Sequence, residues 1–318
     1  MTTPSNTVTT LVNVGQRESL SDMIYRVSPE ETPFFSMIKK GKAKARYEEW
    51  QTESLRTAVA TNYALEGDEI GTLVAGNQPA RVGSYCQIWK ESGGVSRTTD
   101  LVDTAGRKSE TARQKAIKGL EIKRDVEMSI LSNTASRNEA GANARVTAGI
   151  QAWLETNVDR GAGGSDGGFS SGIVAVSTAG TSRTFTEAQI KSVMASAFSN
   201  GAKLSTCFVS PSHKQVFSGF TGIADIRSEV RGQNQAMIHA AADVYVSDFG
   251  AVSIVPHAYA VSSAAILVTP SAASMQVLDG FKTKEMGATG DANKFLMTYE
   301  ACFKVDNEKS HGIVQALS

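Results

Sequence analysis

The stretch DTAGRKSETARQKAIKGLEIKRDVEMSILSN, residues 103–133, is the longest segment of the chain that can form one uninterrupted helix. It contains no proline, and at about 1.5 Å per residue it would extend over roughly 45 Å. At about 100° per residue, its apolar side chains fall mainly in one stripe. This stripe consists of Ala112, Ala116, Leu120, Val126, Ile130 and Leu131. Ile117, Ile122 and Met128 lie outside it, which predicts a second packing surface on the same helix.

The length and composition of the chain favour a globular protein of about two subdomains. A chain of 318 residues exceeds one compact core of ordinary size. Its 32 basic and 32 acidic residues cancel, which excludes the global basic surface typical of nucleic-acid-binding domains. The N-terminus lacks the features of a secretion signal, and no window of about 18 residues is uninterruptedly apolar. We therefore expect no association with a membrane.

The three cysteines, Cys86, Cys207 and Cys302, are widely spaced and odd in number. This pattern argues against a disulfide framework and suits a reducing compartment. We expect the three side chains to be buried as small hydrophobic groups.

Two segments before the long helix have too little apolar surface to fold alone. Residues 1–45 are predicted to form an extended arm, whose end, TPFFSMI, carries Phe34 and Phe35 and needs an anchor. Residues 46–100 predict a long polar hairpin, with turn residues at 66–71 and 76–79. An isolated two-stranded ribbon is only marginally stable in water, so we expect this hairpin to rest on another molecule.

The segments after the long helix alternate between helical and strand patterns. Residues 186–269 predict an α/β unit: Thr186 and Gln189 form a capping box, 204–209 a buried strand, Ser210 and Pro211 a helix start, and 233–242 a further helix. Residues 295–303 alternate as a strand, and HGIVQAL, residues 311–317, is predicted to return beside it. The apolar face of that pair should pack on the long helix.

Residues 168–172, GFSSG, match the G-x-S-x-G pattern that surrounds the nucleophile of serine hydrolases, with Ser170 at its centre. That mechanism needs a strand before the serine and a helix after it. Here a glycine-rich loop precedes and a strand pattern follows, which disfavours catalysis. A serine hydrolase that uses Ser170 stays open as an alternative. The same loop lacks the Lys-Ser/Thr of a phosphate-binding loop.

The remaining candidate motifs also favour ordinary surface or core roles. His213, His239, His257 and His311 are far apart, without metal-ligand spacing. Glu66, Asp68 and Glu69 lack the alternation of a calcium loop and suit a solvated hairpin tip. The basic run Lys39–Arg46 suits a solvated face, with phosphate contact as its alternative. We therefore expect no catalytic residue, no cofactor and no metal site, and a structural protein rather than an enzyme.

The order of these elements resembles the major capsid proteins of tailed phages, whose fold is named after phage Hong Kong 97. The segments that carry the resemblance are TPFFSMI (32–38), GRKSETARQKAIKGLEIKRDVEMSIL (106–131), VSPSHKQVFSGF (209–220), VSDFGAVSIVPHAY (246–259) and KEMGATGDANKFLMTYEACFKVDNEKSHGIV (284–314). They extend over nearly the whole chain. An encapsulin, a cellular shell that holds a cargo enzyme, is the alternative within the same fold.

The resemblance implies an α+β fold divided as in that family. Its parts would be an N-terminal arm (1–45), an extended hairpin loop (46–100), a peripheral domain (101–185) with a spine helix (103–133), an axial domain (186–269) and a return to peripheral strands (270–318). It further implies a homo-oligomer of pentamers and hexamers that forms an icosahedral shell around double-stranded DNA. The expected partners are a separate scaffolding protein, a portal and a possible cement protein, and the expected location is the virion, after assembly in the host cytoplasm.

Overall fold

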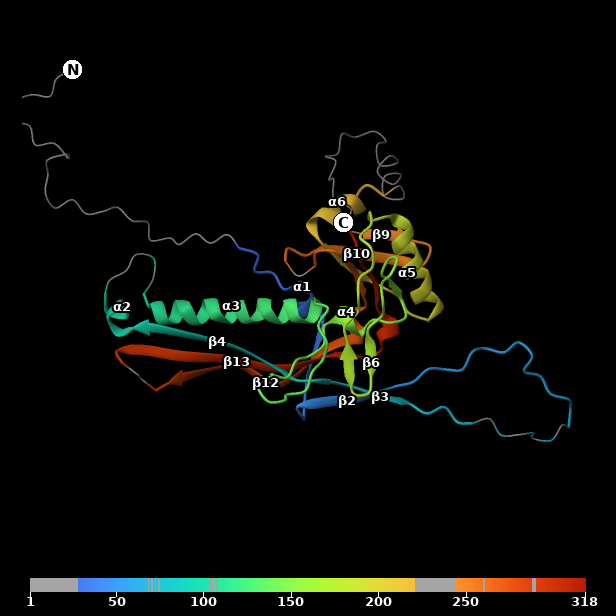
Figure 1. Cartoon of the computed structure of the whole chain (residues 1–318), viewed down its shortest axis with the longest axis horizontal. Helices are drawn as coiled ribbons and strands as arrows, with labels where there is room; N and C mark the ends of the chain where they lie inside the picture. The colour runs from blue at the N-terminus through green and yellow to red at the C-terminus, as the bar shows by residue number, and fades with distance from the viewer. Residues whose placement is uncertain are drawn as a thin grey trace, which may run out of the picture.

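The chain folds around two larger β-sheets and one long helix, as Figure 1 shows. The computed structural model describes residues 28–318 except 68, 70, 72, 74, 103–105, 107, 221–243, 260 and 288–289. Within these residues, helices and strands are mixed as predicted, and the α+β class is confirmed. Residues 1–27, most of the predicted arm, lie outside the described part, as do His239 and the predicted helix 233–242.

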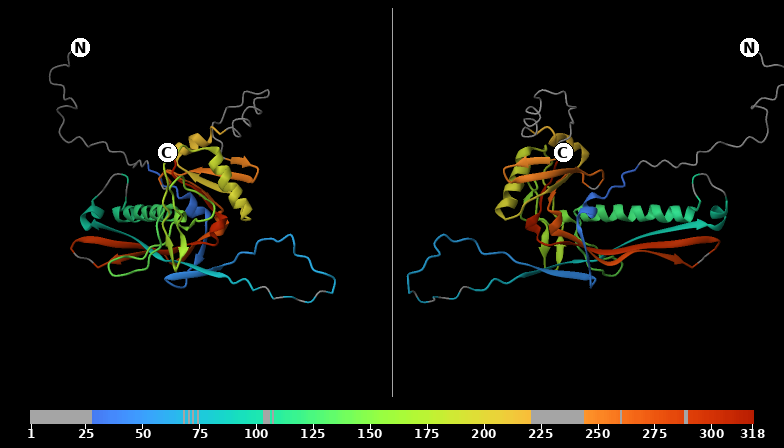
Figure 2. Two further views of the ribbon diagram at one scale, coloured as in Figure 1. Left: turned by 45° about the vertical axis from the view of Figure 1, so that its right-hand side comes forward. Right: turned by 180° about the vertical axis from the view of Figure 1, so that it is seen from behind.

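The four-stranded sheet carries the long helix α3 (Glu110–Leu131) along one of its faces (Figures 1 and 2). Its strands, in spatial order, are β1 (Lys39–Lys42), β12 (Ala273–Met286), β13 (Ala292–Val305) and β4 (Gln87–Ser96). The helix contacts β4 and β13. The prediction that the long helix packs on the strand around residues 295–303 is therefore confirmed.

The start of α3 differs from the prediction. The helix begins at Glu110 rather than at residue 103, because two side chains cap it there. The Ser109 hydroxyl accepts a hydrogen bond from the Ala112 N–H, and Asp100, in the short helix α2 (Arg97–Leu101), accepts from the N–H groups of Glu110 and Thr111. A helix that began earlier would leave these caps unmade.

The buried face of α3 is also rotated relative to the predicted stripe. Val126, Ile130 and Leu131 are buried as expected, but so is Ile122, whereas Ala112 and Ala116 are exposed. Of the residues predicted outside the stripe, Ile117 is half-buried and Met128 is exposed. Positions 122, 126 and 130 lie one helical turn apart and pack on the sheet, and this spacing defines the true core face.

The six-stranded sheet includes the predicted α/β unit and two strands from outside it. Its order is β5 (Val158–Asp159), β14 (Gly312–Val314), β11 (Ala265–Val268), β8 (Thr206–Val209), β10 (Gly250–Pro256) and β9 (Val244–Ser247). The helices α5 (Glu187–Ser199) and α6 (Pro211–Phe217) begin at the predicted caps, the Thr186–Gln189 box and Ser210. The predicted pairing of segment 311–317 with the strand around 295–303 is wrong, since β14 pairs with β11 and β5.

The predicted hairpin is confirmed in its first part only. β2 (Tyr47–Thr52) pairs antiparallel with β3 (Ala80–Tyr85), and the loop between them projects away from the body of the molecule (Figures 1 and 2). Beyond Cys86 the chain leaves the ribbon, because β4 pairs with β13 along its whole length. The expected hairpin boundary at residue 100 is therefore too late.

A buried carboxylate on α3 joins the end of the arm to the six-stranded sheet. Glu127 is fully buried and accepts hydrogen bonds from the N–H groups of Phe34 (2.8 Å) and Phe35 (2.7 Å). These amides belong to the first turn of α1 (Pro33–Met37), whose N–H groups have no partner inside the helix. His257 at the end of β10 approaches the same carboxylate, with its Nε2 at 3.0 Å.

The tautomer of His257 follows from its other nitrogen. Nδ1 lies 3.4 Å from the backbone N–H of Tyr259 and accepts from it, so Nε2 carries a hydrogen and donates to Glu127. Three donors therefore converge on one carboxylate, which offsets the cost of burying its charge.

Phe34 fills the space between the two sheets. Its ring meets the ring of Phe208 in β8 at a centroid distance of 5.4 Å and that of Phe303 in β13 at 5.9 Å, both edge to face. Phe35 is buried against Tyr299. The prediction that these phenylalanines need an anchor is confirmed.

His311 occupies a second junction between the sheets, just before β14. It is fully buried; Nδ1 accepts from the Thr269 N–H at 3.3 Å, and Nε2 donates to the Ala272 carbonyl at 3.4 Å. Burial disfavours the charged imidazolium and lowers the pKa of His311 to about 4. The ring is therefore neutral in the folded chain near neutral pH.

Replacing Glu127 should weaken the fold more than replacing an exposed carboxylate on the same helix. Glu127→Gln turns an amide NH2 toward a backbone N–H and should cost about 1–3 kcal/mol of unfolding free energy. Glu127→Ala leaves three buried donors without an acceptor and should cost about 3–5 kcal/mol. Denaturant unfolding of the unassembled chain measures both, with exposed Asp125→Asn as the control. Equal stability of Glu127→Gln and Asp125→Asn would contradict this role.

The stability of the chain should fall as the pH drops from about 6.5 toward 4. Since the folded pKa of His311 lies below the ordinary value of 6.5, the unfolded chain binds the proton first, and acidification favours unfolding in this window. The full effect is about 3 kcal/mol. Denaturant unfolding of the wild type and of His311→Gln across this window isolates the histidine. If acidification lowers the unfolding free energy of the wild type and of His311→Gln by the same amount, His311 does not cause the loss of stability.

Candidate assembly surfaces

The base of the projecting hairpin is fixed to the body by aromatic contacts. The Trp50 ring in β2 lies 5.6 Å from that of Trp153, which belongs to α4 (Ile150–Trp153). The Tyr47 hydroxyl donates to the carbonyl of Gly172 at 3.1 Å. These contacts fix the direction in which the ribbon leaves the body. Both are made by residues of β2, at the base of the hairpin.

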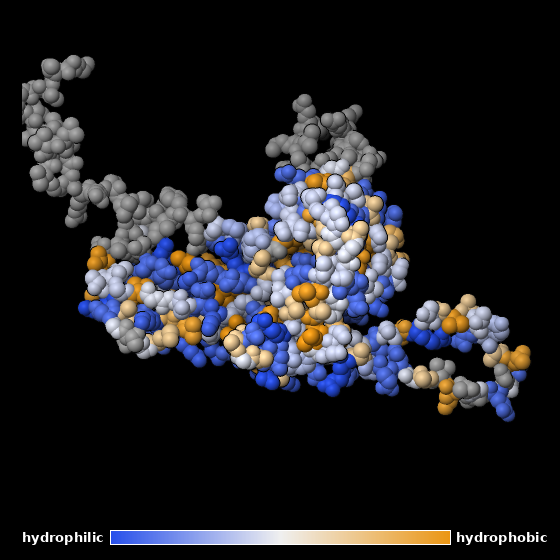
Figure 3. All heavy atoms as spheres, viewed as in Figure 1, coloured by the Kyte–Doolittle hydropathy of each residue, from blue (hydrophilic) through white to orange (hydrophobic). Residues whose placement is uncertain are grey.

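Beyond its base the hairpin has no core. Every described residue from 53 to 79 is exposed, including the larger apolar side chains. Leu55 is 93% exposed, Tyr63 84%, Leu65 82% and Leu73 84%. Figure 3 shows hydrophobic residues at several separate places on the projecting loop. Since burying one such side chain is worth about 1.5–3 kcal/mol, the loop gains stability only when another surface covers it.

The basic run 39–46 lies at the edge of the four-stranded sheet. Its first part is β1, which pairs in parallel with β12 through Lys39–Lys42. The lysines and Arg46 are exposed, and Lys40 holds its ammonium 4.5 Å from the centre of the Phe35 ring. The solvated basic face expected from the sequence agrees with this placement; phosphate contact stays a prediction.

Ser170 lies in a tight hairpin rather than at a nucleophile elbow. It ends β6 (Gly168–Ser170), and β7 (Ile173–Ala175) follows after a two-residue turn. Ser171 and Gly172 both have positive φ, 51° and 89°, as a type I′ hairpin turn requires. The helix that a hydrolase needs after the serine is replaced by a strand.

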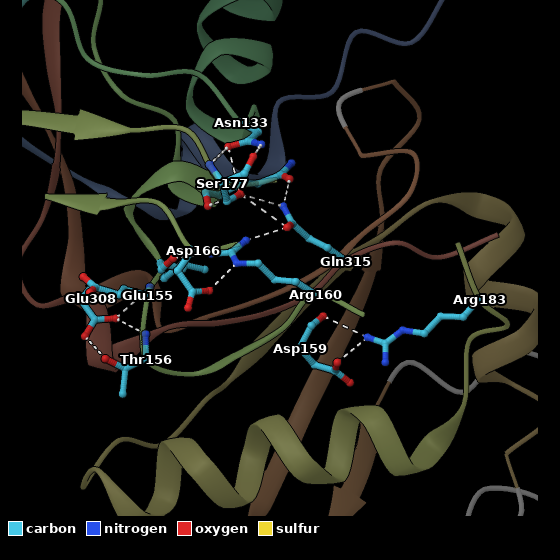
Figure 4. A network of polar contacts seen from close by, with 12 residues as sticks. Asn133, Glu155, Thr156, Asp159, Arg160, Asp166, Ser177, Arg183, Glu308 and Gln315 are labelled. Carbon is cyan, nitrogen blue, oxygen red and sulfur yellow. Dashed lines mark hydrogen bonds and ion pairs between the residues drawn. The ribbon is translucent and has the colours of Figure 1, made fainter. Parts of the chain in front are cut away.

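A buried arginine bonds Asp166 of the glycine-rich loop before Ser170 (Figure 4). Arg160 is 5% exposed; it donates from Nε to Asp166 at 2.7 Å, from Nη1 to Gln315 at 2.6 Å and from Nη2 to the Leu154 carbonyl. Gln315 in turn donates to Gln151 at 3.0 Å. The loop is therefore held through Asp166 to a guanidinium whose other bonds go to Gln315 and the Leu154 carbonyl.

This polar network continues to the end of α3. The Asn133 side chain bonds the backbone of Ser177, and the Ser177 hydroxyl lies within 3.5 Å of Gln315 (Figure 4). Separate pairs join Arg183 to Asp159 and Glu308 to Thr156. The arrangement ties the helix, the glycine-rich loop and the C-terminal segment together, and the sequence patterns gave no sign of it.

The described histidines lie in three separate places. His213 bonds the Ser210 hydroxyl at 2.9 Å, His257 contacts Glu127, and His311 lies between Thr269 and Ala272. Among the residues that the structure describes, no group of three or more His, Cys, Asp or Glu side chains could hold a metal ion. The described helices include none that is long and apolar enough to cross a membrane.

Comparison with solved structures shows capsid proteins of the same fold. An asymmetric unit of the cyanophage A-1(L) capsid matches with a TM-score of 0.67 and 12% identity, over 97% of this chain and 98% of that one. The capsid of cyanophage P-SCSP1u matches with 0.63 and 9%, over 99% and 97%. The holo-SrpI encapsulin complex from Synechococcus elongatus matches with 0.56 and 8%, over 96% and 93%. The Hong Kong 97-like fold is thus confirmed, although fold alone does not separate capsids from encapsulins.

Comparison of sequences distinguishes between capsid proteins and encapsulins for this chain. The major capsid protein of Escherichia phage Phieco32 is 26% identical over 238 residues, which cover 64% of this chain and 66% of that protein. The profile of the SU10 major capsid protein family matches residues 3–318. The match extends over almost the whole chain, and the chain therefore belongs to the SU10 major capsid protein family.

Proposed function

We propose that the chain is the repeating subunit of an icosahedral head shell that encloses the double-stranded DNA of a tailed phage. Copies would associate as pentamers and hexamers, with the hairpin of each copy laid over a neighbouring copy. Membership of a major capsid protein family supports the shell, and the observation that carries the proposal is the coreless loop 53–79, whose described residues are all exposed.

In the single chain the loop has no surface among the described residues to cover its apolar side chains. Its base is held by Trp50 and Tyr47, so it projects in a defined direction, while Leu55, Tyr63, Leu65 and Leu73 meet only solvent. Interfaces between permanently associated subunits commonly bury roughly 2,000–5,000 Å², and a projecting ribbon can supply such area without rearranging the body. Exposure of these apolar side chains costs free energy in the free chain, and their burial against a neighbouring copy would stabilise a lattice.

The two sheets suggest how the subunit would be placed in the shell. We propose that the four-stranded sheet with α3 is the peripheral domain, and that the six-stranded sheet with α5 and α6 is the axial domain that meets its copies around the symmetry axes. The strands β5 and β14 then belong to the axial domain although they lie outside residues 186–269. A scaffolding protein, a portal and a cement protein are proposed as partners on the strength of the family.

Shortening the loop should abolish assembly without unfolding the subunit. Because Thr52 and Ala80 are paired at the end of the ribbon, residues 53–79 can be replaced by Asn-Gly, which favours a two-residue hairpin turn. Electron microscopy, with scaffolding protein supplied, should show shells for the wild type and none for this variant. Its thermal unfolding should change little, since the removed residues are all exposed where described.

A second variant separates loss of apolar contact from loss of length. Leu55→Ser, Tyr63→Ser, Leu65→Ser and Leu73→Ser combined keep the loop and should also prevent shells. Normal shells from both variants would contradict the role of the loop. Wild-type shells that hold protein cargo and never nucleic acid would instead favour the encapsulin alternative.

We also propose that the chain has no hydrolase activity at Ser170. Ser170→Ala should assemble normally and leave any ester turnover of the purified chain unchanged, because the turn after Ser170 leads into a strand. A loss of turnover in this variant would overturn the assignment.

A further inference from the structure

Cys86 and Cys302 face each other where the chain passes from the hairpin into the four-stranded sheet. The register of β4 and β13 pairs Gln87 with Ala301, and one further step of this antiparallel ladder sets Cys86 opposite Cys302. Residues directly opposite on antiparallel strands project to the same face of the sheet. Both cysteines are fully buried, in a small cluster with Ala43 and Leu278.

The backbone geometry at this pair suits a covalent bond. The N–H of Cys86 donates to the Arg46 carbonyl at 2.8 Å, so the polar backbone groups of Cys86 point away from β13. Opposed residues of this kind have Cα atoms about 4.5 Å apart. A disulfide accommodates Cα separations of roughly 4.4–6.8 Å, so closure needs little backbone movement.

The two thiols are chemically unequal. A hydrogen bond from the Cys302 thiol lowers the pKa of Cys86, while the same contact, with burial, raises the pKa of Cys302. The thiolate is the form of cysteine that attacks a disulfide. Cys86 is therefore the more readily deprotonated thiol of the pair, and because it is fully buried it can attack a reagent only when the base of the hairpin opens locally.

We propose that Cys86 and Cys302 are an oxidisable pair that closes into an intramolecular disulfide by exchange with a small-molecule disulfide. The Cys86 thiolate attacks one sulfur of the reagent, whose S–S bond breaks and releases a first thiolate. The Cys302 sulfur, as it loses its proton, then attacks the Cys86 sulfur and releases the second. The reagent gains two electrons, its thiolates take up the protons that the cysteines lose, and the protein sulfurs become bonded.

The bond would fasten the base of the hairpin to the sheet. Cys86 lies between β3 and β4 and Cys302 lies in β13, so closure fixes the point where the ribbon leaves the sheet. Because the loop closed between these positions is long, the disulfide should stabilise the folded chain. The inference concerns the purified chain and stands independently of shell formation.

The third cysteine provides a built-in control. Cys207 lies in the core of the six-stranded sheet, in a different apolar cluster from the pair, and burial raises its pKa to about 12. It should remain a thiol under conditions that oxidise the pair.

The test is to expose the folded chain to oxidised glutathione, unfold it in denaturant, and alkylate the remaining thiols with N-ethylmaleimide. Mass spectrometry should find a single alkylated residue, Cys207, and a cross-linked peptide that joins Cys86 to Cys302. A sample reduced before alkylation should carry the label on all three cysteines. The oxidised chain should also unfold at a higher temperature than the reduced chain.

Two cysteine variants serve as controls for this experiment. Cys207→Ala should form the same bond, whereas Cys302→Ala should keep glutathione on Cys86 and show no rise in unfolding temperature. Three labelled cysteines in the oxidised wild type, or bonds that involve Cys207 or a second chain, would overturn the proposal. The wild-type result decides even if a variant folds poorly.

Discussion

The carboxylate of Glu127 is the contact on which the rest of the structure depends. It sits on the core face of α3, accepts from the first turn of α1 and meets the imidazole of His257. The end of the arm and the six-stranded sheet therefore meet at a buried carboxylate on the helix that packs on the four-stranded sheet, and Phe34 fills the space between the sheets. A carboxylate without these donors would be too costly to bury, so the parts hold one another in place.

Among the described residues, this arrangement separates a packed body from a loop that has no core. Buried polar side chains such as Arg160 and His311 find hydrogen-bond partners within the body. The loop from 53 to 79 leaves large apolar side chains in solvent, although its base is fixed by Trp50. Because the base of the loop is fixed, the loop can present these side chains to a neighbouring copy, which suits assembly.

Local patterns in the sequence predicted where helices and strands lie better than they predicted which of them pack or pair together. The capping box at Thr186, the helix start at Ser210 and the need to anchor Phe34 were predictable, since each depends on neighbouring residues. The burial of Glu127 was not, because a charge on a helix is normally solvated and its donors are distant in sequence. Nor did alternation in β4 or β14 reveal which sheet each would join.

Amide hydrogen exchange, measured on the free chain and on assembled shells, tests the division between body and loop most directly. The account predicts that the amides of Phe34 and Phe35 are protected in both states, because Glu127 accepts from them within one chain. Amides between 53 and 79 should exchange quickly in the free chain and become protected in the shell. Loop amides that stay unprotected in shells, or Phe34 and Phe35 amides that exchange as fast as the loop, would contradict it.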